Sequence, residues 1–269
     1  ENLSPLNQNS YYNDHSLITD PCVANEHFVS NQLSSFIDSN CKKKIIAIHH
    51  RDSHFSGSDQ SWRDSNLEDY SSLILSLLAN NYLIIIMNPF PAQRPEIVNH
   101  PNVFNLCDID FSLWDQLYIL KRVNFLIGTA SGISHWWISY GIPTIMANTV
   151  ALPATPISQG VIHAPKKLSY KDSVFKLPIE SRHKLIQSIL SSTWDGSIWN
   201  YFDAETYKDD ELVDTIEKSI RSFEGQGNTF TSHKLLKGLG ISTKSIPDYY
   251  ISQNCYEHMN SIFSNIINR

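Results

Sequence analysis

Two short polar clusters in this chain combine residue types that can bind phosphate. The first, HHRD at residues 49–52, directly follows the apolar run Ile45–Ile48. Its Arg51 carries a fork of donors that fits a diphosphate bidentately and stays charged. The second cluster, GTASGIS at residues 128–134, lies between an apolar run and a predicted helix. A strand-to-helix turn of this kind offers backbone N–H groups and a helix N-terminus to an anion.

Several residues of these clusters are therefore candidate donor-site residues. Of the two adjacent histidines, one is expected to pack in the core and the other, taken as His50, to face the ligand. The candidates in the turn are Gly128, Thr129, Ser131, Gly132 and Ser134. Structural alternatives stay open: an ordinary capped helix at the turn, and an ion pair between Arg51 and one of the aspartates at 52, 108 and 110.

Other polar residues lie in the predicted loops around the same strands. Asp108 and Asp110 follow the short run 103–106, where one could act as a base or both could lie in a solvated turn. Asn148 follows the last clear strand and could contact a ribose or a base, or serve only the loop. His54 together with HHRD lacks the ligand spacing of a zinc site, so we predict no metal.

Motifs of other phosphate-binding and hydrolytic folds are missing from the sequence. A nucleophile elbow around Ser131 would need glycine at 129 and 133, where Thr129 and Ile133 stand. No Walker loop ending in Gly-Lys-Ser/Thr and no G-x-G-x-x-G fingerprint occurs. The four cysteines form no C-x-x-C pair. Serine hydrolases, P-loop enzymes and simple dehydrogenases are therefore disfavoured.

Strand and helix signals alternate through the first half of the chain. Continuous apolar runs predict strands at 45–48, 82–87, 103–106, 124–129 and 143–147. Apolar residues at helical spacing predict helices at 66–81, 112–122 and 132–140. This alternation predicts an α/β fold: a Rossmann-like parallel sheet with helices on both faces. Ligands of such sheets bind outside the carboxyl ends of the strands, where both clusters lie.

The chain is expected to have three parts. Residues 1–43 are a polar segment or the remnant of a preceding domain, and residues 44–175 form the Rossmann-like donor-binding domain. Residues 176–269 are predicted as a mainly helical region without strands. Its helices are expected at 180–192, 209–223, 229–238 and 255–267.

Charge and hydropathy narrow the class of partner. The net charge of -6 disfavours nucleic acid and anionic membrane surfaces, which require a cationic field. The longest apolar run, Tyr82–Met87, is far too short to span a bilayer. We expect a soluble, cytoplasmic protein, with peripheral association to the inner membrane left open.

Taken in order, these motifs resemble a bacterial family of glycosyltransferases related to the O-fucosyltransferases, which have a GT-B fold. The matching elements are His50-Arg51-Asp52, Arg63 with Asn66 and Tyr70, Cys107–Asp110, Ile127–Gly132 and Pro143–Asn148. The resemblance covers residues 44–150. Arg63 and Asn66 depart from the family pattern, in which they are adjacent, and the region beyond 160 has little that matches.

The resemblance implies an enzyme that moves a sugar from a nucleotide-sugar donor, GDP-linked among the candidates, without metal or cofactor. Arg51 would stabilise the leaving diphosphate, and Asp52 or His54 would be the acceptor's base. Arg63, Asp108, Asp110 and Asn148 would join the turn in holding the donor. A glycan or lipid-linked acceptor in bacterial surface-polysaccharide assembly is expected.

Two other functions remain open beside this one. The chain could be a non-catalytic nucleotide or nucleotide-sugar binding module, or a nucleotide-sugar isomerase of the same fold. A GT-B enzyme has two αβ domains and only one is visible here, so the acceptor domain is expected to be missing, reduced, or made by residues 1–40 and the helical tail. A missing N-terminal domain or a homo-oligomer is a possible partner.

Overall fold

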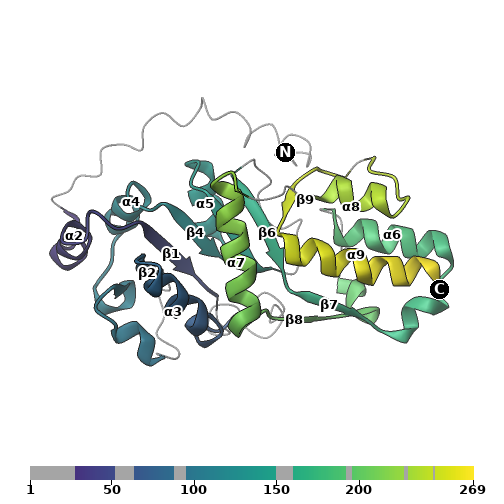
Figure 1. Ribbon diagram of the computed structural model, residues 1–269, viewed down its shortest axis with the longest axis horizontal. Helices are drawn as coiled ribbons and strands as arrows, with labels where there is room; N and C mark the ends of the chain where they lie inside the picture. The colour runs from purple at the N-terminus through teal and green to yellow at the C-terminus, as the bar shows by residue number, and fades with distance from the viewer. Residues whose placement is uncertain are drawn as a thin grey trace. The chain divides into compact units, whose positions relative to one another are not determined.

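The computed structural model describes residues 28–51, 64–87, 95–149, 160–191, 196–226, 230–244 and 246–269 (Figure 1). These residues fall into two compact units. The N-terminal unit holds the described residues up to Ile145 together with Lys208–Val213, and the C-terminal unit holds those in Met146–Tyr207 and Asp214–Arg269. This division does not coincide with the predicted ranges 44–175 and 176–269.

A parallel sheet lies at the centre of the N-terminal unit. Its strands are β1 (Ile45–His49), β2 (Leu83–Ile86), β3 (Val103–Asn105) and β4 (Phe125–Gly128), in the spatial order β3-β2-β1-β4. Every pair is parallel, with Ile48 beside Ile86 on one side and Ile127 on the other. The predicted strands and their parallel arrangement are confirmed. β5 (Thr144–Thr149) begins in this unit and ends in the other.

Helices pack against both faces of this sheet. They are α2 (Asn31–Asp38), α3 (Ser71–Ala79), α4 (Leu113–Leu120) and α5 (Gly132–Ser139), with short 3₁₀ turns at Leu67–Tyr70, Glu96–Asn99 and Leu106–Asp108. α2, α4 and α5 bury Leu33, Ile119 and Trp137 in one core with Ala47 and Ile85 of the sheet. Alternate strand residues such as Ile46 face the opposite side, and α3 packs on β2.

Local sequence signals set the ends of the helices. Ser112 and Asp115 form a reciprocal capping box at the start of α4. The Asp115 carboxylate also accepts a hydrogen bond from the Ser30 N–H at 2.7 Å, which ties the entry of α2 to α4. Gly141 closes α5 with a φ of 75°, the left-handed conformation expected at this position.

The C-terminal unit contains helices and short strands. Its elements are β6 (Val161–Pro165), β7 (Lys167–Tyr170), α6 (Ile179–Ile189), β8 (Phe202–Glu205), α7 (Asp209–Phe223), β9 (Phe230–Thr231), α8 (Ser232–Gly238), β10 (Tyr250–Ile251) and α9 (Gln253–Asn268), with 3₁₀ turns at Asp172–Lys176 and Gly196–Asn200. β10 pairs parallel with β6 and antiparallel with β9, while β7 and β8 form a separate antiparallel pair. The first turn of α7 belongs to the N-terminal unit.

The prediction of a C-terminal region without strands is wrong. The four expected helices are present as α6, α7, α8 and α9, but β8, β9 and β10 lie between them. β9 and β10 have two residues each, too few to show a hydropathy period. β8 reads FDAE, a charged sequence that becomes a strand only through its pairing with β7.

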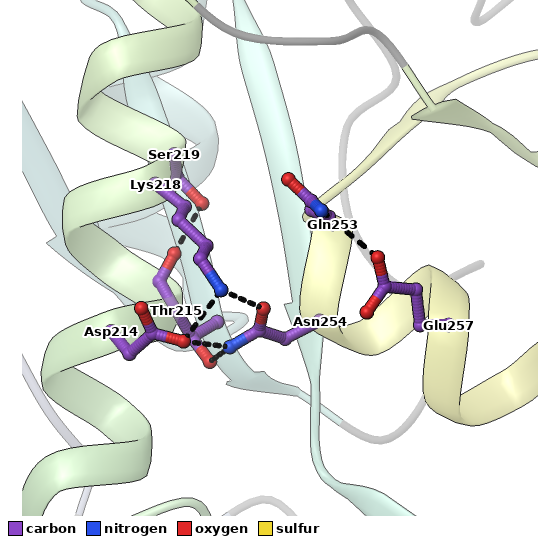
Figure 2. A network of polar contacts seen from close by, with 7 residues as sticks. All are labelled: Asp214, Thr215, Lys218, Ser219, Gln253, Asn254 and Glu257. Carbon is purple, nitrogen blue, oxygen red and sulfur yellow. Dashed lines mark hydrogen bonds and ion pairs between the residues drawn. The ribbon is translucent and has the colours of Figure 1, made fainter.

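A polar network joins α7 to α9 within the C-terminal unit. Figure 2 shows Lys218 and Asn254 converging on the carboxylate of Asp214. Lys218 Nζ donates to Asp214 Oδ2 at 2.8 Å and to Asn254 Oδ1 at 2.9 Å. Asn254 Nδ2 donates to the same carboxylate oxygen at 2.7 Å. These hydrogen bonds from Lys218 and Asn254 lower the pKa of Asp214 below its ordinary value.

Candidate functional site

The two polar clusters meet at one edge of the N-terminal sheet. From β1 the chain builds outward through β2 and β3, and then returns to add β4 on the opposite side of β1. β1 and β4 therefore flank the point at which the strand order reverses, where open α/β sheets bind their ligands. His49 lies directly opposite Gly128 in the register. The Thr129 N–H donates to the His49 carbonyl oxygen at 3.2 Å, so the clusters are in direct contact.

Arg51 leaves β1 as a buried cation. Its side chain is 9% exposed, and its Nε lies 3.8 Å from Oδ1 of Asp64, which is 15% exposed. The Arg51 carbonyl oxygen accepts a hydrogen bond from the Ser65 N–H at 2.7 Å. A carboxylate that lies beside Arg51 in the described residues is thus that of Asp64, which the sequence analysis did not consider.

Both histidines at the end of β1 are buried. His50 Nδ1 lies 3.3 Å from the Ser65 carbonyl oxygen, and this acceptor requires the proton on Nδ1. Burial lowers the pKa of His49 from 6.5 to about 4, and the charges of His50 and Arg51 act in the same direction. His49 is therefore neutral near pH 7, and Arg51 is the fixed positive charge of this strand end.

The turn after β4 holds itself together through two of its hydroxyls. Ser131 Oγ caps α5 by accepting from the Ser134 N–H at 3.3 Å. Ser134 Oγ donates to the Thr129 carbonyl oxygen at 2.7 Å. The Thr129 hydroxyl, by contrast, is buried without a hydrogen-bond partner in the described part of the chain. A buried polar group of this kind calls for a ligand or water partner.

The two glycines of the turn differ in their surroundings. A Cβ at Gly128 would lie 3.3 Å from both the His49 carbonyl oxygen and Ser134 Oγ, so the close approach of β4 to β1 requires glycine. A Cβ at Gly132 would meet no atom within 4 Å. Gly132 is exposed at the first position of α5, which leaves the backbone of the helix N-terminus accessible to an anion.

The other residues predicted for the donor site lie around a turn, in the C-terminal unit or outside the described residues. Asp108 and Asp110 are exposed around the 3₁₀ turn after β3, as in the solvated-turn alternative. Asn148 has a φ of 53°, and its side-chain amide donates to the Tyr207 carbonyl oxygen at 3.0 Å and accepts from the Tyr207 N–H at 2.8 Å. This amide therefore fastens two backbone segments of the C-terminal unit. Asp52, His54 and Arg63 lie outside the described residues.

Asp64 and Ser65 are site residues that the sequence analysis missed. They directly precede a 3₁₀ turn whose Asn66 and Asp69 form a capping box, so the sequence carried a signal for the turn. The sequence carried no signal for the contact of Asp64 with Arg51, because that contact joins residues distant in the sequence. The buried Tyr70 supports this segment, with its hydroxyl 3.5 Å from Ser65 Oγ.

The described residues contain no group of three or more His, Cys, Asp or Glu side chains suited to a metal ion. In the same part of the chain, no helix combines the length and apolarity needed to cross a bilayer.

No protein-family model and no curated protein matches the sequence. What the site can do therefore rests on its geometry: a buried guanidinium and an open helix N-terminus at the reversal of strand order.

Proposed function

We propose that the N-terminal unit is the donor-binding half of a GT-B-type glycosyltransferase. It would take a sugar from a nucleotide-sugar donor and pass it, without a metal ion, to a glycan or lipid-linked acceptor of bacterial surface-polysaccharide assembly. The supporting observation is the pairing of β1 with β4, which brings Arg51 and the turn at 128–134 to the reversal of strand order.

In this proposal the donor's diphosphate lies against the N-terminus of α5. The bond between the sugar C1 and the diphosphate oxygen breaks, its electron pair stays on that oxygen, and the acceptor oxygen bonds to C1. Arg51 opposes the negative charge that grows on the leaving diphosphate. The acceptor loses its proton to a base, for which Asp52 and His54 remain the predictions.

A binding panel tests the proposal directly. The full chain is titrated calorimetrically with GDP, UDP and CMP and with sugars linked to each, and we expect micromolar affinity for one nucleotide series. Release of the nucleotide from the matching donor is then followed in wild type and in Arg51→Lys, which keeps the charge beside Asp64 but loses the fork. The proposal fails if no nucleotide compound binds, or if Arg51→Lys turns over donor at the wild-type rate.

A second function is favoured by one specific observation. The carboxylate of Asp64 lies beside Arg51 and faces a cation. A non-catalytic nucleotide-sugar binding module needs the cation and the turn but no base. Tight binding of a donor that is neither hydrolysed nor transferred by the full chain would support this module in place of the enzyme.

A further inference from the structure

The exposed face of α4 combines apolar side chains with a cation. Leu113 is 60% exposed, Leu117 is half-buried and Lys121 is exposed. They follow one another at intervals of four residues, so they lie on the same face of the helix. Phe28, which is 61% exposed, adds an aromatic ring beside this helix by stacking on Trp114 with the ring centroids 6.0 Å apart.

Further cations lie at the carboxyl end of α4. The segment Lys42–Lys44 precedes β1, and Lys121 and Arg122 follow the last turn of α4. The Asn124 N–H donates to the Ile45 carbonyl oxygen at 2.8 Å, and Asn124 Oδ1 accepts from the Ile45 N–H at 2.7 Å. These two hydrogen bonds bring cations from two separate stretches of the sequence to one end of the helix.

Acids are few in these two stretches. The segments 38–44 and 121–124 contain one acid, Asp38, beside their five lysine and arginine residues. Lys43 Nζ donates to the side-chain oxygen of Asn102 at 2.8 Å, and a neutral amide does not offset its charge. The carboxyl end of α4 therefore has an excess of positive charge.

We propose that this surface binds a bilayer that contains anionic phospholipid. The α4 surface is defined by its exposed apolar residues and nearby lysines: Phe28, Leu113, Leu117, Lys42, Lys43 and Lys121. Aromatic and leucine side chains beside lysines are the composition of segments that lie in the headgroup region. Asp108 and Asp110 precede the opposite end of α4, where apolar side chains and not cations would make the contact.

The net charge of -6 does not prevent such a contact. Exposed charges are screened over a Debye length, about 8 Å at physiological ionic strength. The stretch from Leu113 to Lys121 alone spans about 12 Å. An anionic headgroup beside Lys121 therefore interacts mainly with the cations around it and only weakly with acids elsewhere in the chain.

This inference goes beyond the proposed transfer and does not depend on it. A lipid-linked acceptor would lie in the same bilayer, so binding through the α4 surface would bring the chain to such an acceptor. Vesicle binding requires no nucleotide, so it is measured independently of the donor site.

Sedimentation of the full chain with phospholipid vesicles tests the proposal. Vesicles of phosphatidylcholine alone are compared with vesicles of phosphatidylcholine and phosphatidylglycerol in equal parts. We expect the chain to sediment with the anionic vesicles and not with the neutral ones, and high salt should weaken this binding.

The triple variant Lys42→Gln/Lys43→Gln/Lys121→Gln removes three cations of the α4 surface. Each lysine near an anionic bilayer contributes about fivefold to binding, so the affinity for anionic vesicles should fall roughly a hundredfold. Circular dichroism checks that the variant is folded. If it is not, Lys42→Gln/Lys121→Gln replaces it, with an expected loss of about 25-fold.

A second triple variant separates the α4 surface from the net charge of the chain. Lys176, Lys184 and Lys237 are exposed lysines of the C-terminal unit. Replacing all three by glutamine changes the net charge by the same amount and should leave the affinity within about twofold of wild type.

A pair of leucine variants tests the apolar part. Leu113→Gln removes an apolar side chain of the α4 surface and should weaken vesicle binding about fivefold. Leu75, on α3, is 56% exposed, so Leu75→Gln is a matched control and should leave binding unchanged.

The outcomes separate the two proposals. No binding to either kind of vesicle, or equal binding to both, overturns the role of the α4 surface. Equal losses in the two triple variants, or in the two leucine variants, overturn it as well. Binding of anionic vesicles by a chain that binds no nucleotide overturns the proposed function and supports the α4 surface.

Discussion

Each unit of the protein contains an aspartate paired with a cation, and the two pairs are built in opposite ways. In the C-terminal unit, Asp214 and Lys218 are 48% and 34% exposed and lie 2.8 Å apart, with Asn254 completing the hydrogen bonds (Figure 2). In the N-terminal unit, Arg51 is 9% and Asp64 15% exposed, but their charged atoms lie 3.8 Å apart.

The exposed pair is geometrically good and energetically minor, because solvent screens it and both side chains lose conformational freedom. The buried pair is geometrically looser, but solvent screens its charges less, so removing one of them costs more.

The largest effect should come from removing one member of the buried pair. Arg51→Ala leaves the Asp64 carboxylate buried without this guanidinium, and we expect a loss of about 3–5 kcal/mol in the free energy of unfolding. Urea denaturation measures it. The double variant Arg51→Met/Asp64→Asn removes both charges and should regain most of the loss. A double variant as unstable as Arg51→Ala would show that the pairing of charges is not what stabilises this edge.

The two units can also be compared through their buried histidines, His49 in the N-terminal unit and His163 in the C-terminal unit. Burial lowers the pKa of His49 to about 4 and that of His163 to about 3 from the ordinary 6.5. Because the folded state resists protonation, their contribution is complete above pH 6.5 and is lost as the pH falls toward 4 and 3.

For His49 this loss amounts to roughly 3 kcal/mol. Denaturation at a series of pH values should show stability falling below pH 6.5, with a shallower fall in His49→Asn and in His163→Gln. A slope that neither substitution changes would contradict the assignment.

A smaller effect is expected at the turn beside Arg51. Ser131→Ala removes the cap of α5 and should lower the free energy of unfolding by about 1 kcal/mol. If the turn also binds the nucleotide, the same variant should weaken GDP binding while Ser112→Ala, which removes the cap of α4, should not. Equal effects of both variants on binding would assign Ser131 to the helix alone.

The smallest effect should come from the exposed pair. Lys218→Met keeps most of the aliphatic side chain and loses the contacts to Asp214 and Asn254. We expect a change within about 0.5 kcal/mol in the free energy of unfolding, reduced further at high salt. A loss comparable with that of Arg51→Ala would erase the difference between the two regions.

The N-terminal sheet was predictable because its signals are local. Continuous apolar runs predicted β1, β2 and β4, and the structure confirms these strands. Placing both clusters at strand ends required only the rule that parallel strands expose their carboxyl ends on one edge.

Contacts between distant segments were not predictable. Asp64 lies beside Arg51 although the two are far apart in the sequence, and nothing in the sequence distinguishes it from the aspartates at 52, 108 and 110. Asn148 was assigned to the donor site by its place after a strand, yet the structure shows its amide bonded to the backbone of Tyr207. β9 and β10 exist only through pairing with each other and with β6.

The hydrogen bond from the Ser65 N–H to the Arg51 carbonyl oxygen also bears on how well the protein tolerates insertions after β1. It links the backbone of Arg51 to that of Ser65, so the distance between these two residues does not depend on how many residues lie between them. Doubling such a segment costs only about 0.6 kcal/mol of closure entropy. Lengthening the chain between Arg51 and Ser65 should therefore cost little stability, provided that this backbone hydrogen bond is kept.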